Sequence, residues 1–107
     1  MVDESVEMTV RRYLEAVRAA GINASRAVLF GSHARGEADE WSDIDIIVIA
    51  PEFDAPSGAG LIDRLWILRA HTDSRIEPFA CGEREWETDG ARPIIEIARR
   101  EGIVIAA

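Results

Sequence analysis

The sequence predicts an α/β domain, of the α+β kind, in which a small mixed β-sheet is flanked by helices. Short β-rich runs alternate along the chain with segments whose apolar residues recur every three to four positions. Of the 107 residues, 48% are hydrophobic and 30% are charged, which is an ordinary globular balance. A chain of this length fits one domain, so we expect a single domain over 1–107.

The first half of the chain predicts a helix, a strand, a helical turn and a second strand. An amphipathic helix is expected over 2–20 and ends at Gly21. Its apolar side contains Val6, Val10, Leu14 and Val17. The run at 26–30 is β-rich and leads into a short helical turn at 32–35. The strand at 42–50 is apolar on both faces beyond its polar beginning, as is typical of a central strand covered on both sides.

The second half predicts a loop followed by alternating helices and strands. The segment 51–60 contains proline, glycine and serine, which favour a loop, and 61–72 has helical spacing. A third strand is expected at 74–81, where Pro78 cannot donate a ladder hydrogen bond and therefore indicates an edge or an outward-facing position. The remaining elements are expected to be helices at 83–87 and 93–100 and a short strand at 102–106.

Two carboxylates stand at the beginning of the predicted central strand. Asp43 and Asp45 are two residues apart, so a strand places both on one face. At about 4 Å and an effective dielectric constant of about 20, two such charges repel by about 4 kcal/mol. A divalent cation would neutralise them, and Mg²⁺ prefers oxygen ligands while keeping waters and phosphate oxygens. The pair alone leaves a second interpretation open, in which both acids lie at a solvated rim.

A glycine and a serine lie ten residues upstream, between the first strand and the helical turn. At such a junction, backbone N–H groups point outward and bind anions, and glycine allows close approach. Gly31 and Ser32 alone are more typical of a simple turn. Together with Asp43 and Asp45 on the next strand, they predict a phosphate-binding loop beside a metal site.

At this point the sequence resembles a known family. The stretch "GSHARG" followed by "SDIDIIV" is similar to the signature of the DNA polymerase β-like nucleotidyltransferase superfamily: Gly-Ser, about ten residues, then an acid-hydrophobic-acid triplet. The chain most resembles the minimal nucleotidyltransferase (MNT) domains, small prokaryotic proteins that are often paired with HEPN-domain partners in toxin–antitoxin systems. The order of helices and strands extends the resemblance over nearly the whole chain, which implies the polymerase β-like nucleotidyltransferase fold.

The resemblance also implies roles for individual residues. Asp43 and Asp45 would be catalytic acids that bind two Mg²⁺ ions, and Glu77 in "RIEPF" matches the third acid of the family. That position more often holds aspartate, so a salt-bridging role for Glu77 stays open. Gly31 and Ser32 would hold the nucleotide's phosphates. The remaining motif residue, Arg35, would either contact a phosphate or brace the loop.

As function we expect Mg²⁺-dependent transfer of AMP from ATP to a hydroxyl, with a tyrosine of a partner HEPN-type toxin as the acceptor. One alternative is a non-catalytic antitoxin that neutralises its partner by binding alone. A second is transfer to a small molecule, although family members of that kind usually carry a further domain to hold the substrate. The presence of Asp43, Asp45 and Glu77 together favours catalysis. Nucleotide preference, the identity of the acceptor and homo-oligomer formation stay open.

Charge and cysteine content bear on partners and location. The formal net charge is −8, which disfavours nucleic acid as the main ligand and suits a basic surface on a protein partner. Cys81 is the single cysteine, so the chain can form no internal disulfide, and we expect it to fill a small core position. The apolar run at 44–50 is too short to span a membrane. We therefore expect a cytoplasmic protein with no membrane contact.

Five aromatic or imidazole side chains have no partner evident from the sequence. His33 and His71 lack metal-ligand spacing, and we expect both at the surface. Trp41, Trp66 and Trp86 are expected to serve in packing rather than in stacking on a base.

Overall fold

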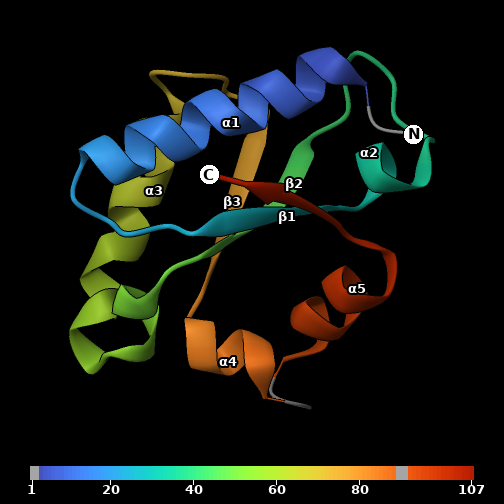
Figure 1. The fold of residues 1–107 in the computed structure, drawn as a ribbon. Helices are drawn as coiled ribbons and strands as arrows, with labels where there is room; N and C mark the ends of the chain where they lie inside the picture. The colour runs from blue at the N-terminus through green and yellow to red at the C-terminus, as the bar shows by residue number, and fades with distance from the viewer. Residues whose placement is uncertain (1–2, 89–91) are drawn as a thin grey trace.

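The computed structural model describes residues 3–88 and 92–107 (Figure 1). The helices are α1 (Glu4–Ala19), α2 (Ser32–Arg35), α3 (Leu61–Arg69), α4 (Glu83–Glu87) and α5 (Pro93–Glu101). The strands are β1 (Arg26–Phe30), β2 (Ile44–Ile49), β3 (Ile76–Cys81) and β4 (Ile103–Ala106). Two short 3₁₀ helices, η1 (Pro51–Asp54) and η2 (Pro56–Gly60), lie between β2 and α3.

The four strands form one mixed sheet in the order β3-β2-β1-β4. β1 pairs antiparallel with β2 and β4, whereas β2 and β3 run parallel. The central position of β2 and the edge position of β3 agree with the apolar run and with Pro78. Helices lie on both sides of the sheet (Figure 1), so the predicted α+β class with a small mixed sheet and flanking helices is confirmed.

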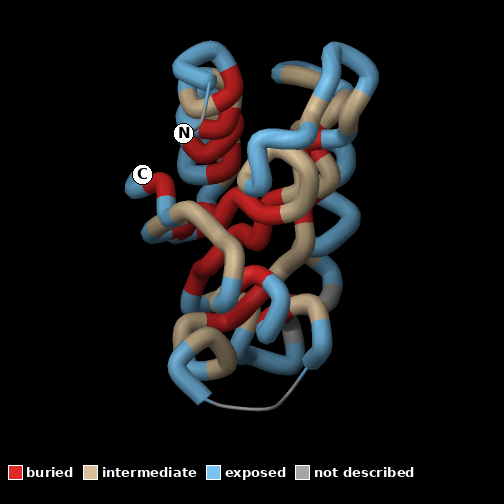
Figure 2. The backbone as a smooth tube through the Cα atoms, turned by 90° about the vertical axis from the view of Figure 1, so that its right-hand side faces the viewer, coloured by how far each residue is buried: buried red, intermediate tan, exposed pale blue. Residues whose placement is uncertain are grey.

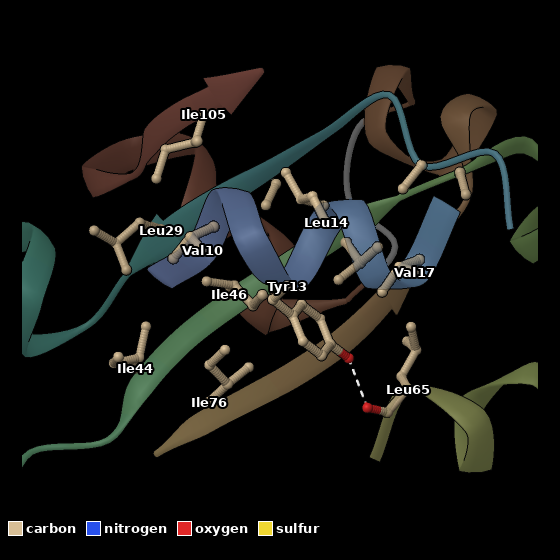
Figure 3. Close-up of a cluster of buried hydrophobic side chains, with 14 of the residues drawn as sticks. Val10, Tyr13, Leu14, Val17, Leu29, Ile44, Ile46, Leu65, Ile76 and Ile105 are labelled. Atoms are coloured by element: carbon tan, nitrogen blue, oxygen red, sulfur yellow. Dashed lines mark hydrogen bonds between the residues drawn. The ribbon is translucent and has the colours of Figure 1, made fainter. Parts of the chain in front are cut away.

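The larger apolar cluster lies between the sheet and the pair α1 and α3 (Figure 3). Tyr13 is fully buried there, and its hydroxyl donates a hydrogen bond of 2.6 Å to the carbonyl of Leu65, which joins the two helices. Burial raises the pKa of Tyr13, so the hydroxyl stays a donor. The other labelled members of this cluster are Val10, Leu14, Val17, Leu29, Ile44, Ile46, Ile76 and Ile105.

A smaller apolar cluster lies on the opposite face of the sheet, against α5. Its members are Val28, Phe30, Ile47, Ile49, Cys81, Ile95 and Ala98. Buried backbone therefore runs through the middle of the molecule, along the sheet and the helix sides that cover it (Figure 2). Cys81 is 1% exposed, which agrees with its predicted core position.

Helix α1 begins and ends at the signals that the sequence contains. The Asp3 carboxylate accepts a hydrogen bond of 2.8 Å from the backbone N–H of Ser5, as an N-cap does. The helix stops at Ala19, and Gly21 follows with a φ of +93°. The expected first residue of this helix, at position 2, lies outside the described residues.

The segment 51–60, expected to be a loop, instead forms η1 and η2. Proline begins each of these helices, and its fixed φ suits a first helical turn. The Glu52 carboxylate also accepts hydrogen bonds of 2.9 and 2.8 Å from the backbone and side-chain nitrogens of Asn23. These contacts bind the segment to the turn before β1.

Candidate active site

The structure places the three predicted acids side by side. β2 and β3 run parallel and in register, so Asp45 is the direct neighbour of Glu77, and adjacent strands lie about 4.8 Å apart. Asp43 immediately precedes β2 rather than lying within it, because the strand begins at Ile44 instead of 42. Asp45 lies on the sheet face of the smaller cluster, because it is two residues from Ile47 and alternate residues of a strand share a face.

The acids strongly influence one another. Burial raises the pKa of Asp45, a hydrogen bond with Glu77 lowers it, and repulsion from Asp43 raises it, with a net upward result. Burial also raises the pKa of Glu77, which is raised further by the hydrogen bond with Asp45 and by repulsion from Asp43. Without a cation, Asp45 and Glu77 therefore both bind their protons more tightly than ordinary carboxyl groups do.

The donor chemistry of this group suits Mg²⁺. All three side chains offer carboxylate oxygens, the ligands that this ion prefers. Within residues 3–88 and 92–107, no three His, Cys, Asp or Glu side chains are already arranged as ligands around one point.

Gly31 brings the neighbouring loop against the acids. Its φ is +75°, a conformation that other residues rarely adopt. A Cβ at this position would lie 2.5 Å from Oδ2 of Asp45, so the Asp45 carboxylate would have to move. Glycine therefore suits the backbone turn and lets the loop approach the Asp45 carboxylate closely.

The contacts of Gly31 and Arg35 lead to a residue that the sequence did not suggest. The backbone N–H of Gly31 donates to Oε1 of Glu101 at 3.0 Å. The guanidinium of Arg35 donates to Oε1 of Glu101 at 3.2 Å and to Oε1 of Glu37 at 2.7 Å. Of the two roles left open for Arg35, these contacts are those of a brace. No motif or periodicity points to Glu101.

Ser32 and His33 begin α2 beside the acids, and both are half-buried. His33, expected at the surface, lines a surface depression of about 430 Å³ together with Asp3 and Arg75. Its Nε2 atom is nevertheless buried, with no hydrogen-bond partner within the described residues. None of the three acids lines this depression.

The tryptophans differ in their surroundings. Trp41 is 83% exposed, so the expectation that it serves in packing is wrong. It precedes Asp43 by two residues, and its backbone N–H donates to the Asp39 carboxylate at 2.8 Å. Trp86 packs against the smaller cluster, as expected, whereas Trp66 is 38% exposed.

None of the described helices has the length and apolar character needed to cross a lipid bilayer.

Comparisons with known proteins agree with this geometry. The sequence profile of the nucleotidyltransferase domain family matches residues 10–98, a range that includes all six site residues predicted above but ends before Glu101. Among curated proteins no sequence matches. A similar crystal structure is that of a candidate nucleotidyltransferase from Sulfolobus solfataricus, with a TM-score of 0.63 and 18% sequence identity, over 94% of this chain and 78% of that chain. At that identity the likeness shows a shared fold, while the family match covers most of the sequence. The chain belongs to the nucleotidyltransferase domain family.

Proposed function

We propose that the protein transfers AMP from ATP to an acceptor hydroxyl in a Mg²⁺-dependent reaction. The observation that carries this proposal is the contact between loop and acids: Gly31 lies against Asp45, which is paired with Glu77 across the parallel strands. A phosphate-binding loop and a carboxylate group at that separation are what nucleotidyl transfer requires, because the reaction joins a triphosphate to a metal-activated hydroxyl.

Asp43, Asp45 and Glu77 would hold two Mg²⁺ ions. When bound, the ions neutralise the triphosphate and lower the pKa of the attacking hydroxyl. The acceptor oxygen forms a bond to the α-phosphorus, the bond from that phosphorus to the bridging oxygen of the β-phosphate breaks, and pyrophosphate leaves. The acceptor proton would pass to a carboxylate, and we assign this role to Glu77.

The loop residues would position the triphosphate. Gly31 provides the close approach to Asp45, and the Ser32 hydroxyl would donate a hydrogen bond to a phosphate oxygen. Arg35 would keep the loop in place through Glu37 and Glu101. Fixed groups of this kind contribute by orientation and charge stabilisation, so no protein nucleophile is required.

We propose a tyrosine of a partner HEPN-type toxin as the acceptor. The resemblance to minimal nucleotidyltransferase antitoxins supports this choice, and the net charge of −8 suits a basic protein surface better than a nucleic acid. Attached AMP adds bulk and negative charge to the partner, which would repel RNA from its site. Trp41, exposed beside Asp43, is suited to contact such a partner or the adenine ring.

A second candidate function is neutralisation by binding alone. One observation favours it: within residues 3–88 and 92–107, no three His, Cys, Asp or Glu side chains are gathered as ligands of one metal ion. A protein that silences its partner by covering a surface needs no metal. Transfer to a small-molecule hydroxyl would use the same acids. It differs from protein modification only in the molecule that accepts AMP.

Mass spectrometry of the partner separates these functions. The protein encoded beside this one is incubated with it, ATP and Mg²⁺, and the expected result is the addition of one or more AMP groups to a tyrosine. Asp43→Asn should add none, while Asp63→Asn, which changes an exposed carboxylate on α3, should act like the wild type. A partner that stays unmodified but is inhibited on mixing would replace the enzymatic proposal with the binding function.

A further inference from the structure

The last turn of α5 contacts the loop of the candidate active site. Glu101 is the final residue of α5, and its carboxylate accepts hydrogen bonds from the Gly31 backbone and from the Arg35 side chain. Its side chain is 26% exposed, less than the 46% of Arg35 or the 60% of Glu37. A partly buried, doubly hydrogen-bonded carboxylate contributes more than an exposed surface pair does.

The fold holds Glu101 at this place. β1 and β4 pair with Leu29 opposite Ile103, and this register continued by two residues brings Gly31 opposite Glu101. The turn between α5 and β4 packs closely on β1, because a Cβ at Gly102 would lie 2.4 Å from Cγ1 of Val28. Figure 1 shows the chain turning from α5 into β4 on the side of the molecule where α2 lies.

Two opposite roles are conceivable for this carboxylate. As a competitor, it would occupy the position of a phosphate, and nucleotide would have to displace it. As a clamp, it would hold the loop from behind. The strand order decides between them: Glu101 meets Gly31 from the β4 side of β1, whereas Asp45 belongs to β2 on the other side. The carboxylate thus meets Gly31 from the side of β4 and not from the side of the acids.

We infer that Glu101 is a positioning residue for the nucleotide. Through Gly31 and Arg35, it holds the loop between β1 and α2 close to Asp45. The triphosphate that this loop binds is then positioned beside the acids. This inference rests on the proposed function and extends the candidate site to the junction of α5 and β4. That junction lies beyond residue 98, where the match to the family ends.

Titration of the intact protein with ATP and Mg²⁺ tests the inference through Glu101→Ala and Glu101→Gln. Glu101→Ala should raise the Kd for ATP about tenfold, which corresponds to about 1.4 kcal/mol. Glu101→Gln keeps an oxygen that can accept from Gly31 but loses the charge opposite Arg35, so its effect should be smaller. In steady-state assays, the KM for ATP should rise more than kcat falls, a division that a loss of folded protein would not give.

Two further measurements isolate the clamp. Hydrogen exchange of the Gly31 amide without nucleotide should be faster in Glu101→Ala, whereas Glu37→Gln removes only the second partner of Arg35 and should leave that exchange slow. Thermal unfolding confirms that each variant is folded, and Glu101→Gln supports the comparison if Glu101→Ala does not fold.

The outcomes are distinct. Tighter ATP binding in Glu101→Ala would overturn the inference in favour of a competitor, and unchanged binding with unchanged Gly31 exchange would show a merely structural contact. A wild-type protein that binds no ATP and transfers no AMP would overturn the proposed function, and this inference with it. Wild-type binding that is insensitive to Glu101 would overturn the inference alone.

Discussion

Two neighbouring rungs of the parallel ladder between β2 and β3 have opposite chemistry. One rung pairs Asp45 with Glu77, and the next rung on the same face pairs Ile47 with Phe79. Ile47 is 1% exposed in the smaller cluster, whereas Asp45 and Glu77 are half-buried at the beginning of the strands. One pleat therefore separates a position that stabilises the sheet from a position where charge repulsion opposes folding. The acidic rung is the one expected to serve function at the expense of stability.

The largest effect is expected at the acidic rung, on activity. Asp43→Asn combined with Asp45→Asn should lower AMP transfer about ten-thousandfold, because fixed charges at a reacting phosphate each contribute on the order of a hundredfold. The same change should abolish the rise in Tm caused by ATP with Mg²⁺, measured by scanning calorimetry. It should not lower the Tm without metal, since it removes the repulsion that acts on Asp45. If the double variant is markedly less stable than the wild type without metal, these acids stabilise the fold and do not form a metal site.

The next effect is expected at the apolar rung, on stability. Ile47→Ala should lower the free energy of unfolding by about 3 kcal/mol, because it removes buried methyl groups and leaves a cavity between the sheet and α5. Urea unfolding measures this loss. Transfer activity at temperatures where the variant stays folded should be nearly unchanged. A loss of activity as large as that of the acid variants, in folded protein, would remove the distinction between the rungs.

The comparison of the two rungs also explains what the sequence could predict. The apolar run after Asp45 is a local pattern, and together with Pro78 it places β2 in the centre of the sheet and β3 at the edge. Strand periodicity likewise puts Asp43 and Asp45 on one face. The approach of Gly31 to Asp45 agrees with the prediction that the glycine-serine turn lies beside the acids of the next strand.

Glu101 could not be predicted, since its contact depends on tertiary register. It is separated from Gly31 by 70 positions, and only the pairing of β4 with β1 brings the two together. The same holds for His33, whose buried Nε2 depends on the packing of α2. By sequence alone, the prolines that begin η1 and η2 favour a loop, because local sequence does not show that Asn23 donates hydrogen bonds to Glu52.

Within the acidic rung, substitutions of Glu77 and Asp45 should have different effects on ATP binding and on transfer. Glu77→Gln should lower transfer about a hundredfold, the contribution of a proton-accepting group, while the Kd for ATP stays within about twofold. The reason is that Glu77 is expected to act on the acceptor hydroxyl rather than on the triphosphate. Calorimetric titration with ATP and Mg²⁺ measures binding, and mass spectrometry of the partner measures transfer. Full activity in this variant would show that a residue other than Glu77 serves as the third acid.

The smallest effect is expected in the dependence of stability on pH. The pKa values of Asp45 and Glu77 are raised in the folded protein, mainly by burial, so the folded state binds their protons more tightly than the unfolded state does. Their contribution is therefore complete below the ordinary carboxyl pKa of about 4 and is lost as the pH rises through the raised values. Without divalent cations, the wild type should lose stability relative to Asp45→Asn as the pH rises above about 4, by less than the effect of Ile47→Ala.

Denaturant unfolding of the two proteins at each pH measures this difference, and Asp63→Asn on α3 controls for a general loss of negative charge. Mg²⁺ should reduce the trend in the wild type, because a bound cation removes the repulsion between the carboxylates. The variant Asp45→Asn should respond less to Mg²⁺. A wild type that instead gains stability relative to Asp45→Asn as the pH rises would mean that these carboxylates are stabilised as anions by the protein alone. The acidic rung would then resemble the apolar one in supporting the fold, and the need for a cation at Asp45 and Glu77 would disappear.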